Sequence, residues 1–181
     1  MGMSTLIISA SPSSSSRTIR LATLVGERLG RRGVDSSLLD LRQLPPADLL
    51  HANFSAPEIV TALERVKSAS GVVIATPVYK AAYTGLLKAF LDLLPQFGLR
   101  DKVVLPLATG GTLAHVLSID YALRPVLSSL DPLHVVAGLF VVDKQLSFQP
   151  GADLELDADL SAKLDAAIGS FVIGLRRATG A

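Results

Sequence analysis

Short, wholly apolar runs alternate along this chain with longer stretches of helical periodicity, and this alternation constrains the fold more than any other feature. The runs Leu6-Ile7-Ile8, Val72-Val73-Ile74 and Val103-Val104-Leu105 are too short for helices and too apolar for half-exposed strands. They therefore predict strands that are buried on both faces. With the segments 34–41 and 134–142, the strand-then-helix pattern recurs five times. Such alternation predicts an α/β protein with a doubly wound parallel sheet.

The expected strands cover residues 4–10, 34–41, 71–76, 102–108 and 134–142, and the expected helices 19–32, 57–68, 84–94, about 113–130 and 157–176. Five strands with right-handed crossovers favour the flavodoxin-like order 2-1-3-4-5 over the six-stranded dinucleotide-binding fold. Residues 143–156 are polar and are expected to be irregular. Because the chain has 181 residues and no internal repeat, one domain is expected over residues 1–181.

Composition disfavours several classes of protein. The net charge is +1, whereas nucleic-acid-binding modules usually carry a clear basic excess. The chain has no cysteine, and His51 and His134 show no metal-ligand spacing, so neither thiolate chemistry nor a metal site is expected. Hydrophobic residues make up 49% of the chain, yet no run approaches the roughly 18 apolar residues of a membrane span. Without a signal-peptide pattern either, we expect a cytoplasmic protein that buries its apolar excess in the sheet and a subunit interface.

Three loops are expected to meet at the carboxyl edge of this sheet, where open α/β folds bind ligands. They are residues 11–18, 76–85 and 109–112, which follow the first, third and fourth predicted strands. The first combines several serine hydroxyls and Arg17 with the start of a helix, a combination that suits a phosphate monoester. A flexible, serine-rich helix cap would produce the same sequence.

The second and third loops favour a planar ligand. Pro77 supplies no N–H and so disfavours continuation as a central strand, and Tyr79 offers a flat surface beside it. The alternative for the tyrosines is packing at an interface, which we favour for Tyr83. Gly110 and Gly111 permit close approach of the backbone to a ligand, although an ordinary strand-to-helix turn would also use them.

Longer motifs in these loops resemble a known family. The runs ATPVYKAAYTGLLK from Ala75 and KVVLPLATGGTLAH from Lys102 resemble the signature of NADPH-dependent FMN reductases, and the likeness extends from the first strand to about Val142. The run DYALRPVL from Asp120 is similar to the branch that serves two-component alkanesulfonate monooxygenases. The all-serine middle of the first loop departs from the family pattern.

This resemblance implies an enzyme that uses NADPH or NADH to reduce FMN by direct hydride transfer. It implies FMN held loosely or as a substrate, and reduced FMN passed to a partner monooxygenase in sulfonate metabolism. The residues implied for the FMN phosphate are Ser11, Ser16, Arg17 and Thr18, and those for the isoalloxazine are Pro77, Val78, Tyr79, Lys80, Thr109, Gly110 and Gly111.

No catalytic side chain is expected, because the cofactors carry the hydride chemistry themselves. The helix after residues 109–112 is expected to direct its dipole at the negative charge of reduced flavin. Cations that could contact the additional phosphate of NADPH are Arg17, Lys80, Arg100 and Lys102.

Pro125 falls inside the helix expected over residues 113–130. It cannot donate to the carbonyl of Tyr121, and its ring would clash there, so the helix must kink, break or contain a π-bulge around residues 118–124. The resemblance implies a π-helix at Tyr121 and a homotetramer, a dimer of dimers, with Tyr121 at an interface. An ordinary proline kink with Tyr121 on the surface is the alternative.

Two other functions would suit the same three loops. A flavodoxin-type electron carrier has this fold, although such carriers tend to be acidic and this chain has a net charge of +1. A quinone or azo-compound reductase that keeps FMN bound and reduces a second substrate is the other alternative.

Overall fold

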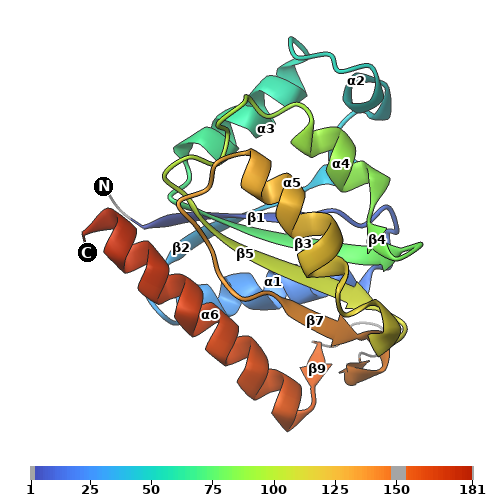
Figure 1. Cartoon of the computed structure of the whole chain (residues 1–181), viewed down its shortest axis with the longest axis vertical. Helices are drawn as coiled ribbons and strands as arrows, with labels where there is room; N and C mark the ends of the chain where they lie inside the picture. Colours follow the sequence, from blue (N-terminus) through green and yellow to red (C-terminus); the bar gives the residue numbers. More distant parts are fainter. Residues whose placement is uncertain (1–2, 148–153, 181) are drawn as a thin grey trace.

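A central parallel sheet lies between two layers of helices in the computed structural model, which describes residues 3–147 and 154–180 (Figure 1). The sheet contains β1 (Ser4–Ser9), β2 (Asp35–Asp40), β3 (Gly71–Tyr79), β5 (Val103–Gly110), β6 (His134–Val135) and β7 (Leu139–Val142). Its order is β2-β1-β3-β5, followed by β6 and β7, which both pair with β5. With β6 and β7 taken as one interrupted strand, the flavodoxin-like order 2-1-3-4-5 is confirmed.

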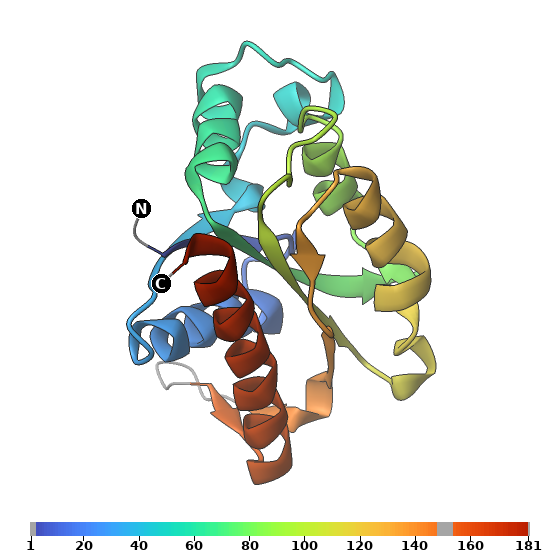
Figure 2. The same ribbon diagram turned by 60° about the vertical axis from the view of Figure 1, so that its left-hand side comes forward.

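The helices divide between the two faces of the sheet (Figures 1 and 2). One face is covered by α1 (Arg17–Gly30) and α6 (Ala158–Thr179), and the other by α3 (Pro57–Ser68), α4 (Gly85–Leu91) and α5 (Arg124–Ser129). The connection after β2 contains a 3-10 turn (Leu41–Gln43) and a short helix, α2 (Pro46–Leu50). No helix in the described part of the chain combines the length and the apolar character that crossing a membrane requires.

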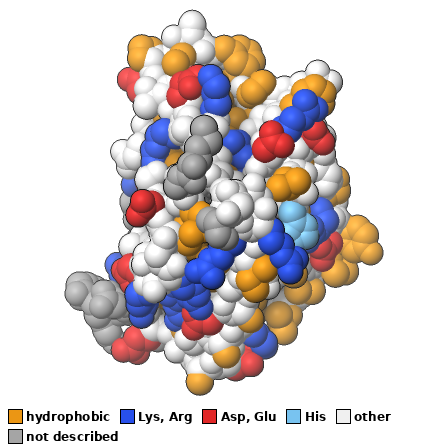
Figure 3. All heavy atoms as spheres, turned by 90° about the vertical axis from the view of Figure 1, so that its left-hand side faces the viewer, with side chains coloured by type: hydrophobic (Ala, Val, Ile, Leu, Met, Phe, Trp, Pro, Cys, Tyr) orange, Lys and Arg blue, Asp and Glu red, His pale blue; other side chains and the backbone are white. Residues whose placement is uncertain are grey.

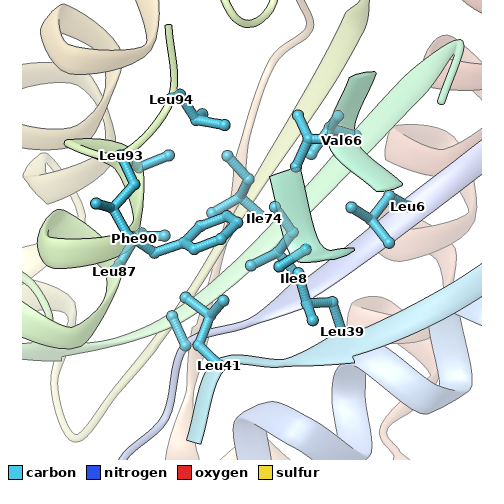
Figure 4. Packing of buried hydrophobic residues seen from close by; sticks show 14 of the residues in the cluster. Leu6, Ile8, Leu39, Leu41, Val66, Ile74, Leu87, Phe90, Leu93 and Leu94 are labelled. Atoms are coloured by element: carbon cyan, nitrogen blue, oxygen red, sulfur yellow. The ribbon is translucent and has the colours of Figure 1, made fainter. Parts of the chain in front are cut away.

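Two hydrophobic clusters, one on each face, hold these layers together. Because successive strand residues point to opposite faces, Leu6 and Ile8 belong to the cluster beneath α3 and α4, whereas Ile7 belongs to the one beneath α1 and α6. In the first cluster, Phe90 of α4 extends toward Ile74 of β3 (Figure 4). Each fully buried side chain of this size contributes about 1.5–3 kcal/mol, so the clusters fix both helical layers on the sheet.

The last predicted strand, residues 134–142, is interrupted, so the prediction of one continuous strand was wrong. β6 pairs with Val103 and Val104, and β7 resumes pairing at Leu107. Pro106 lies in the gap. Its carbonyl oxygen would be 2.9 Å from a Cβ on Gly138, so this carbonyl points toward the outer strand. The N–H and C=O of one strand residue point in the same direction. The N–H that Pro106 lacks is therefore missing on the side of the outer strand, which explains the gap in pairing.

The segment after β5 is not the single helix predicted over residues 113–130. It comprises a 3-10 turn (Leu113–His115), a π-helix (Ile119–Leu123) and α5. The expected π-helix is therefore present, and the N–H of Arg124 donates to the carbonyl of Ile119. Pro125 follows in the first turn of α5. Tyr121 is 79% exposed.

Two small additions extend the predicted architecture. β4 (Ala82–Tyr83) forms an antiparallel hairpin with the end of β3. Residues 143–156 were expected to be irregular, but they contain a 3-10 turn (Asp143–Gln145) and the antiparallel pair β8 (Leu146–Ser147) and β9 (Glu155–Leu156).

Candidate functional site

The loop after β1, the ends of β3 and β5, and Gly111 directly after β5 enclose one cavity of about 390 Å³ at the carboxyl edge of the sheet. Ten of the eleven residues predicted to bind FMN line it: Ser11, Ser16, Arg17, Thr18, Pro77, Val78, Tyr79, Thr109, Gly110 and Gly111. Ser13, Ser15 and Asp143 also line the cavity. Segments about a hundred residues apart in the sequence thus form one site.

The first loop ends in a capped helix. Ser16 is the N-cap of α1, and its Oγ accepts a hydrogen bond from the N–H of Thr18 at 3.0 Å. The first turn of α1 contains no acidic residue, so the positive end of the helix dipole is not neutralised there. The cap and a phosphate site are compatible, because Ser13, Ser15 and Arg17 expose their side chains while Ser16 holds the helix start.

Thr18 connects the first loop to the third. The Oγ1 atoms of Thr18 and Thr109 share a hydrogen bond of 2.7 Å, and the two residues are only 1% and 2% exposed. A buried hydroxyl pair holds its partners in one geometry, because separating them leaves polar groups unsatisfied. The bond therefore fixes the distance between the start of α1 and the end of β5.

β3 extends through Pro77 to Tyr79, beyond the strand end predicted at residue 76. The carbonyl of Ala75 accepts a hydrogen bond from the N–H of Ala10, which follows β1. The backbone nitrogen of Pro77, two residues further along β3, therefore faces the same side as that carbonyl. β1 has already ended there. The missing N–H of Pro77 consequently costs no ladder hydrogen bond, and the strand can continue as one wall of the cavity.

Of the eleven residues predicted to bind FMN, Lys80 is the one outside the described cavity lining. Lys80 and Ala81 form the two-residue turn between Tyr79 and Ala82, with φ values of 51° and 64°. Positive φ at both central positions defines the hairpin turn that matches strand twist, and it costs non-glycine residues roughly 1–2 kcal/mol each. The turn carries Lys80 to an exposed hairpin tip, while Tyr79 remains at the cavity rim, 51% exposed.

A buried hydroxyl network anchors this hairpin. Thr84 caps α4, because its Oγ1 accepts from the N–H of Leu87 at 3.2 Å. The same hydroxyl donates to the carbonyl of Ala10 at 2.8 Å, and the N–H of Thr84 donates to Thr76 Oγ1 at 3.2 Å. The wall formed by β3 and β4 is thereby attached to the end of β1.

The third loop is shorter than predicted, and no α-helix starts from it. Thr109 and Gly110 still belong to β5 and pair with Val141 and Val142 of β7. A Cβ on Gly110 would lie 2.9 Å from Cζ of Phe140, so a larger residue there would have to displace the end of this partly buried ring. Since only a three-residue 3-10 turn follows, the predicted helix dipole at this loop was wrong.

Asp143 was missed because the sequence argument considered only three of the strand ends. It follows β7 directly, and the carboxyl end of the outermost strand was the signal that could have identified it. Among the described residues that line the cavity, Asp143 carries the acidic side chain.

Arg100 and Lys102 do not reach the cavity. They precede β5 and therefore lie at its amino end. Figure 3 shows the molecule from the side of the strands' amino ends, with lysine and arginine side chains in blue. Lys102 Nζ donates to the carbonyls of Lys67 and Ala69, which end α3, at 2.9 and 2.7 Å. Burial lowers the pKa of Lys102. Its role is structural, and both residues are excluded as cavity cations.

The cavity fits FMN in its chemistry. Hydroxyls, a guanidinium and a helix N-terminus suit a phosphate ester. Tyr79 and the backbone of Gly110 and Gly111, which line the same cavity, suit a flat ring. Among the described residues, no three His, Asp or Glu side chains gather as a metal site would require.

A comparison with known protein families shows the class of this protein. Residues 3–147 match the model of the NADPH-dependent FMN reductases, and the chain belongs to that family. It is therefore an oxidoreductase that reduces FMN with a reduced nicotinamide dinucleotide as electron donor.

Three similar proteins illustrate the relationship. An FMN reductase (NADPH) of Escherichia coli strain K12 is 42% identical over 97% of this chain and 91% of its own length. An FMN reductase (NADPH) of Pseudomonas putida strain KT2440 is 40% identical over 94% of this chain and 87% of its own. The apo crystal structure of an NADH:FMN oxidoreductase (EMOB) is 42% identical with a TM-score of 0.86, covering 93% of this chain and 88% of the other.

Proposed function

We propose that the carboxyl-edge cavity is the FMN site of this reductase. The observation that carries the proposal is the convergence of the first loop and the ends of β3 and β5 on one cavity that combines a helix N-terminus with Tyr79 at its rim. In this arrangement the phosphate lies at the start of α1, beside Ser13, Ser15 and Arg17, and the ring lies against Tyr79 and Gly110. When bound, FMN accepts a hydride from NADPH or NADH.

The chain's own residues bind and orient the flavin rather than take part in proton transfer. Arg17 and Asp143 are the charged side chains of the described cavity lining. Arg17 would bind the phosphate, and the Asp143 carboxylate would accept hydrogen bonds from hydroxyl or amide groups of the flavin. The Thr18–Thr109 bond holds the two ends of the site at a fixed separation. We assign no catalytic side chain.

We further propose that reduced FMN leaves the cavity for a flavin-dependent monooxygenase of sulfonate metabolism. The likeness of residues 120–127 to the sulfonate branch supports this partner. The half-exposed Tyr79 supports a rim that is open to solvent, as release of the flavin requires.

Steady-state oxidation of NADPH with free FMN as the sole acceptor tests this function, together with gel filtration after loading with FMN. We expect turnover and loss of FMN from the protein on the column. Full retention of FMN without FMN-dependent turnover would overturn the proposal. Turnover only with an added quinone or azo compound would instead support the FMN-retaining alternative.

Arg17→Gln tests the orientation of FMN in the cavity. The variant should weaken binding of FMN by about tenfold, because a charge-assisted contact to phosphate is lost. Riboflavin lacks that phosphate, and its affinity should not change. Arg42→Gln, in the connection after β2, is the matched control. Equal weakening of both flavins would place Arg17 away from the phosphate.

We also propose that the chain assembles as a homotetramer through the surface formed by Leu113, Val116, Leu117 and Tyr121. These four side chains are exposed within nine residues of sequence, directly after the third loop. Clustered exposed apolar side chains mark interaction surfaces. In such an assembly the π-helix presents Tyr121 to a second copy of the chain.

A further inference from the structure

A second cavity, of about 580 Å³, lies next to the proposed FMN site. Gly111 lines both cavities. At the end of β7 the two separate between consecutive residues, since Val142 lines the second cavity and Asp143 the first. A ligand that extends from the flavin past Gly111 would therefore enter this second space.

The walls of the second cavity come from the segment after β5 and from three further elements. Phe140 of β7 contributes to an apolar floor, Lys144 comes from the 3-10 turn after β7, and Asp157 and Lys163 come from the start of α6. These elements are tied together by Gln145. Its Oε1 accepts from the N–H of Val142 at 3.2 Å, and its Nε2 donates to Asp157 Oδ2 at 3.4 Å.

The described lining carries two lysines and one carboxylate, that of Asp157, whose oxygens already accept hydrogen bonds from Gln145 and Leu160, so its charge balance favours an anion. Lys163 Nζ lies 2.6 Å from Asp159 Oδ2, but both side chains are well exposed, and such surface pairs contribute little. A phosphate with two or more negative charges can compete with that carboxylate. Two ammonium groups above an apolar floor therefore suit a ligand that carries phosphate beside a flat, apolar ring.

We propose that this cavity binds the phosphate-bearing adenosine half of NADPH or NADH, with Lys144 and Lys163 at its phosphates and Phe140 beneath the adenosine. The inference rests on the proposed placement of FMN in the neighbouring cavity, because the nicotinamide must meet the flavin there. It replaces Arg100 and Lys102, which lie at the opposite edge of the sheet, as the cations that recognise the donor.

The double variant Lys144→Gln, Lys163→Gln tests this site, with Lys67→Gln as the matched control. Lys67, like Lys163, is an exposed lysine paired with a carboxylate on its own helix. We expect the double variant to raise the KM for NADPH about tenfold, while kcat and the FMN dissociation constant stay within about twofold. A larger effect with NADPH than with NADH assigns the lysines to the additional phosphate, and equal effects assign them to the pyrophosphate.

Calorimetric titration with adenosine 2′,5′-bisphosphate provides a readout that is independent of turnover. The wild type and the Lys67→Gln control should bind this probe equally, and the double variant about tenfold more weakly. Unchanged KM and unchanged probe affinity would overturn the inference, as would an equal loss of FMN affinity. Lysine-dependent probe binding in a protein that fails to reduce FMN would contradict the proposed function while leaving this site standing.

Discussion

Thr18 and Thr109, ninety-one positions apart in the chain, share a buried hydroxyl–hydroxyl hydrogen bond of 2.7 Å at the bottom of the carboxyl-edge cavity. The bond connects the helix start at one end of the cavity to the strand end at the other. Its loss should therefore affect both the stability of the fold and the shape of the flavin site.

Thr18→Val should destabilise the protein by about 1–3 kcal/mol, because the Thr109 hydroxyl is left buried without its partner. FMN affinity should fall as well. Urea unfolding of the flavin-free protein measures the first effect, and fluorescence titration with FMN measures the second. In a double-mutant cycle with Thr109→Val, the second substitution should cost much less once the first is present. Strictly additive losses would show that the two hydroxyls do not interact.

Thr84→Val removes the cap of α4 and the bond to the Ala10 carbonyl while keeping the side-chain shape. We expect a loss of about 1–3 kcal/mol in the free energy of unfolding, since a helix cap contributes about 0.5–2 kcal/mol and a buried carbonyl also loses its partner. Thr84→Ser keeps the hydroxyl and should recover most of the loss. If serine and valine are equally destabilising, packing of the methyl group rather than the hydroxyl network is responsible.

Gly138→Ala should destabilise the protein by about 1–3 kcal/mol, because the added methyl would lie 2.9 Å from the Pro106 carbonyl oxygen. Gly169→Ala in α6 is the control. No atom lies within 4 Å of its would-be Cβ, so it should stabilise the helix by up to about 1 kcal/mol. Thermal unfolding of the two variants should shift in opposite directions. A neutral Gly138→Ala would mean that the chain beside Pro106 relaxes without cost.

Asp165→Asn should make stability less dependent on acid pH. Asp165 Oδ1 accepts from Arg32 at 2.8 Å, and Arg28 lies 3.1 Å from Oδ2, which joins α6 to α1. The hydrogen bond from Arg32 lowers the pKa of Asp165, and burial opposes it. A lowered pKa stabilises the fold above the unfolded value of about 4, and this contribution disappears as pH falls through the folded value.

The free energy of unfolding of the wild type should thus exceed that of the Asp165→Asn variant by about 0.5–1 kcal/mol at pH 7. The difference is modest because the carboxylate is partly exposed. The difference should begin to shrink as pH falls below about 4 and should disappear as pH falls through the lowered pKa of the folded state. Urea unfolding at a series of pH values measures it. A difference that persists unchanged at pH 2.5 would show that it does not arise from the carboxylate charge.

Leu117→Asp tests the proposed assembly. A charge at the centre of the exposed surface should convert a tetramer into smaller species, because burying an unpaired carboxylate is costly. Light scattering after gel filtration measures the mass, and Ile173→Asp, on the exposed face of α6, is the control. A wild-type monomer, or an unchanged tetramer in the variant, would exclude this surface as the interface.

The fold could be predicted from the sequence because strands that are buried on both faces are recognisable as short, wholly apolar runs. Runs such as Val72-Val73-Ile74 cannot be accommodated except between two helical layers, and the carboxyl edge follows from strand direction. Pro125 likewise predicted an irregularity in its helix, since a proline within a helix removes one backbone hydrogen bond wherever it occurs. That this irregularity is a π-helix was implied by the family resemblance.

The features that could not be predicted from the sequence depend on which residues become neighbours in the folded chain. Pro106 was visible in the sequence, but its effect falls on the strand beside it, and only the register shows that Gly138 lies opposite. Asp143 became a site residue because β7 ends next to Gly110, which depends on where pairing with β5 stops. Arg100 and Lys102 could have been excluded from the sequence alone, because residues that precede a parallel strand lie at the edge away from the ligand.

The interruption opposite Pro106 also affects how copies of this chain can meet. A long outer strand presents an unbroken row of N–H and C=O groups to which a strand of another molecule can attach. Here the outer edge is divided into pieces of two and four residues. Arg124 further donates to the carbonyls of Val135 and Val136, at 3.2 and 3.4 Å. A proline in the sheet interior thus protects the edge formed by β6 and β7 against unwanted strand addition, whereas β2 at the opposite edge is a continuous strand of six residues.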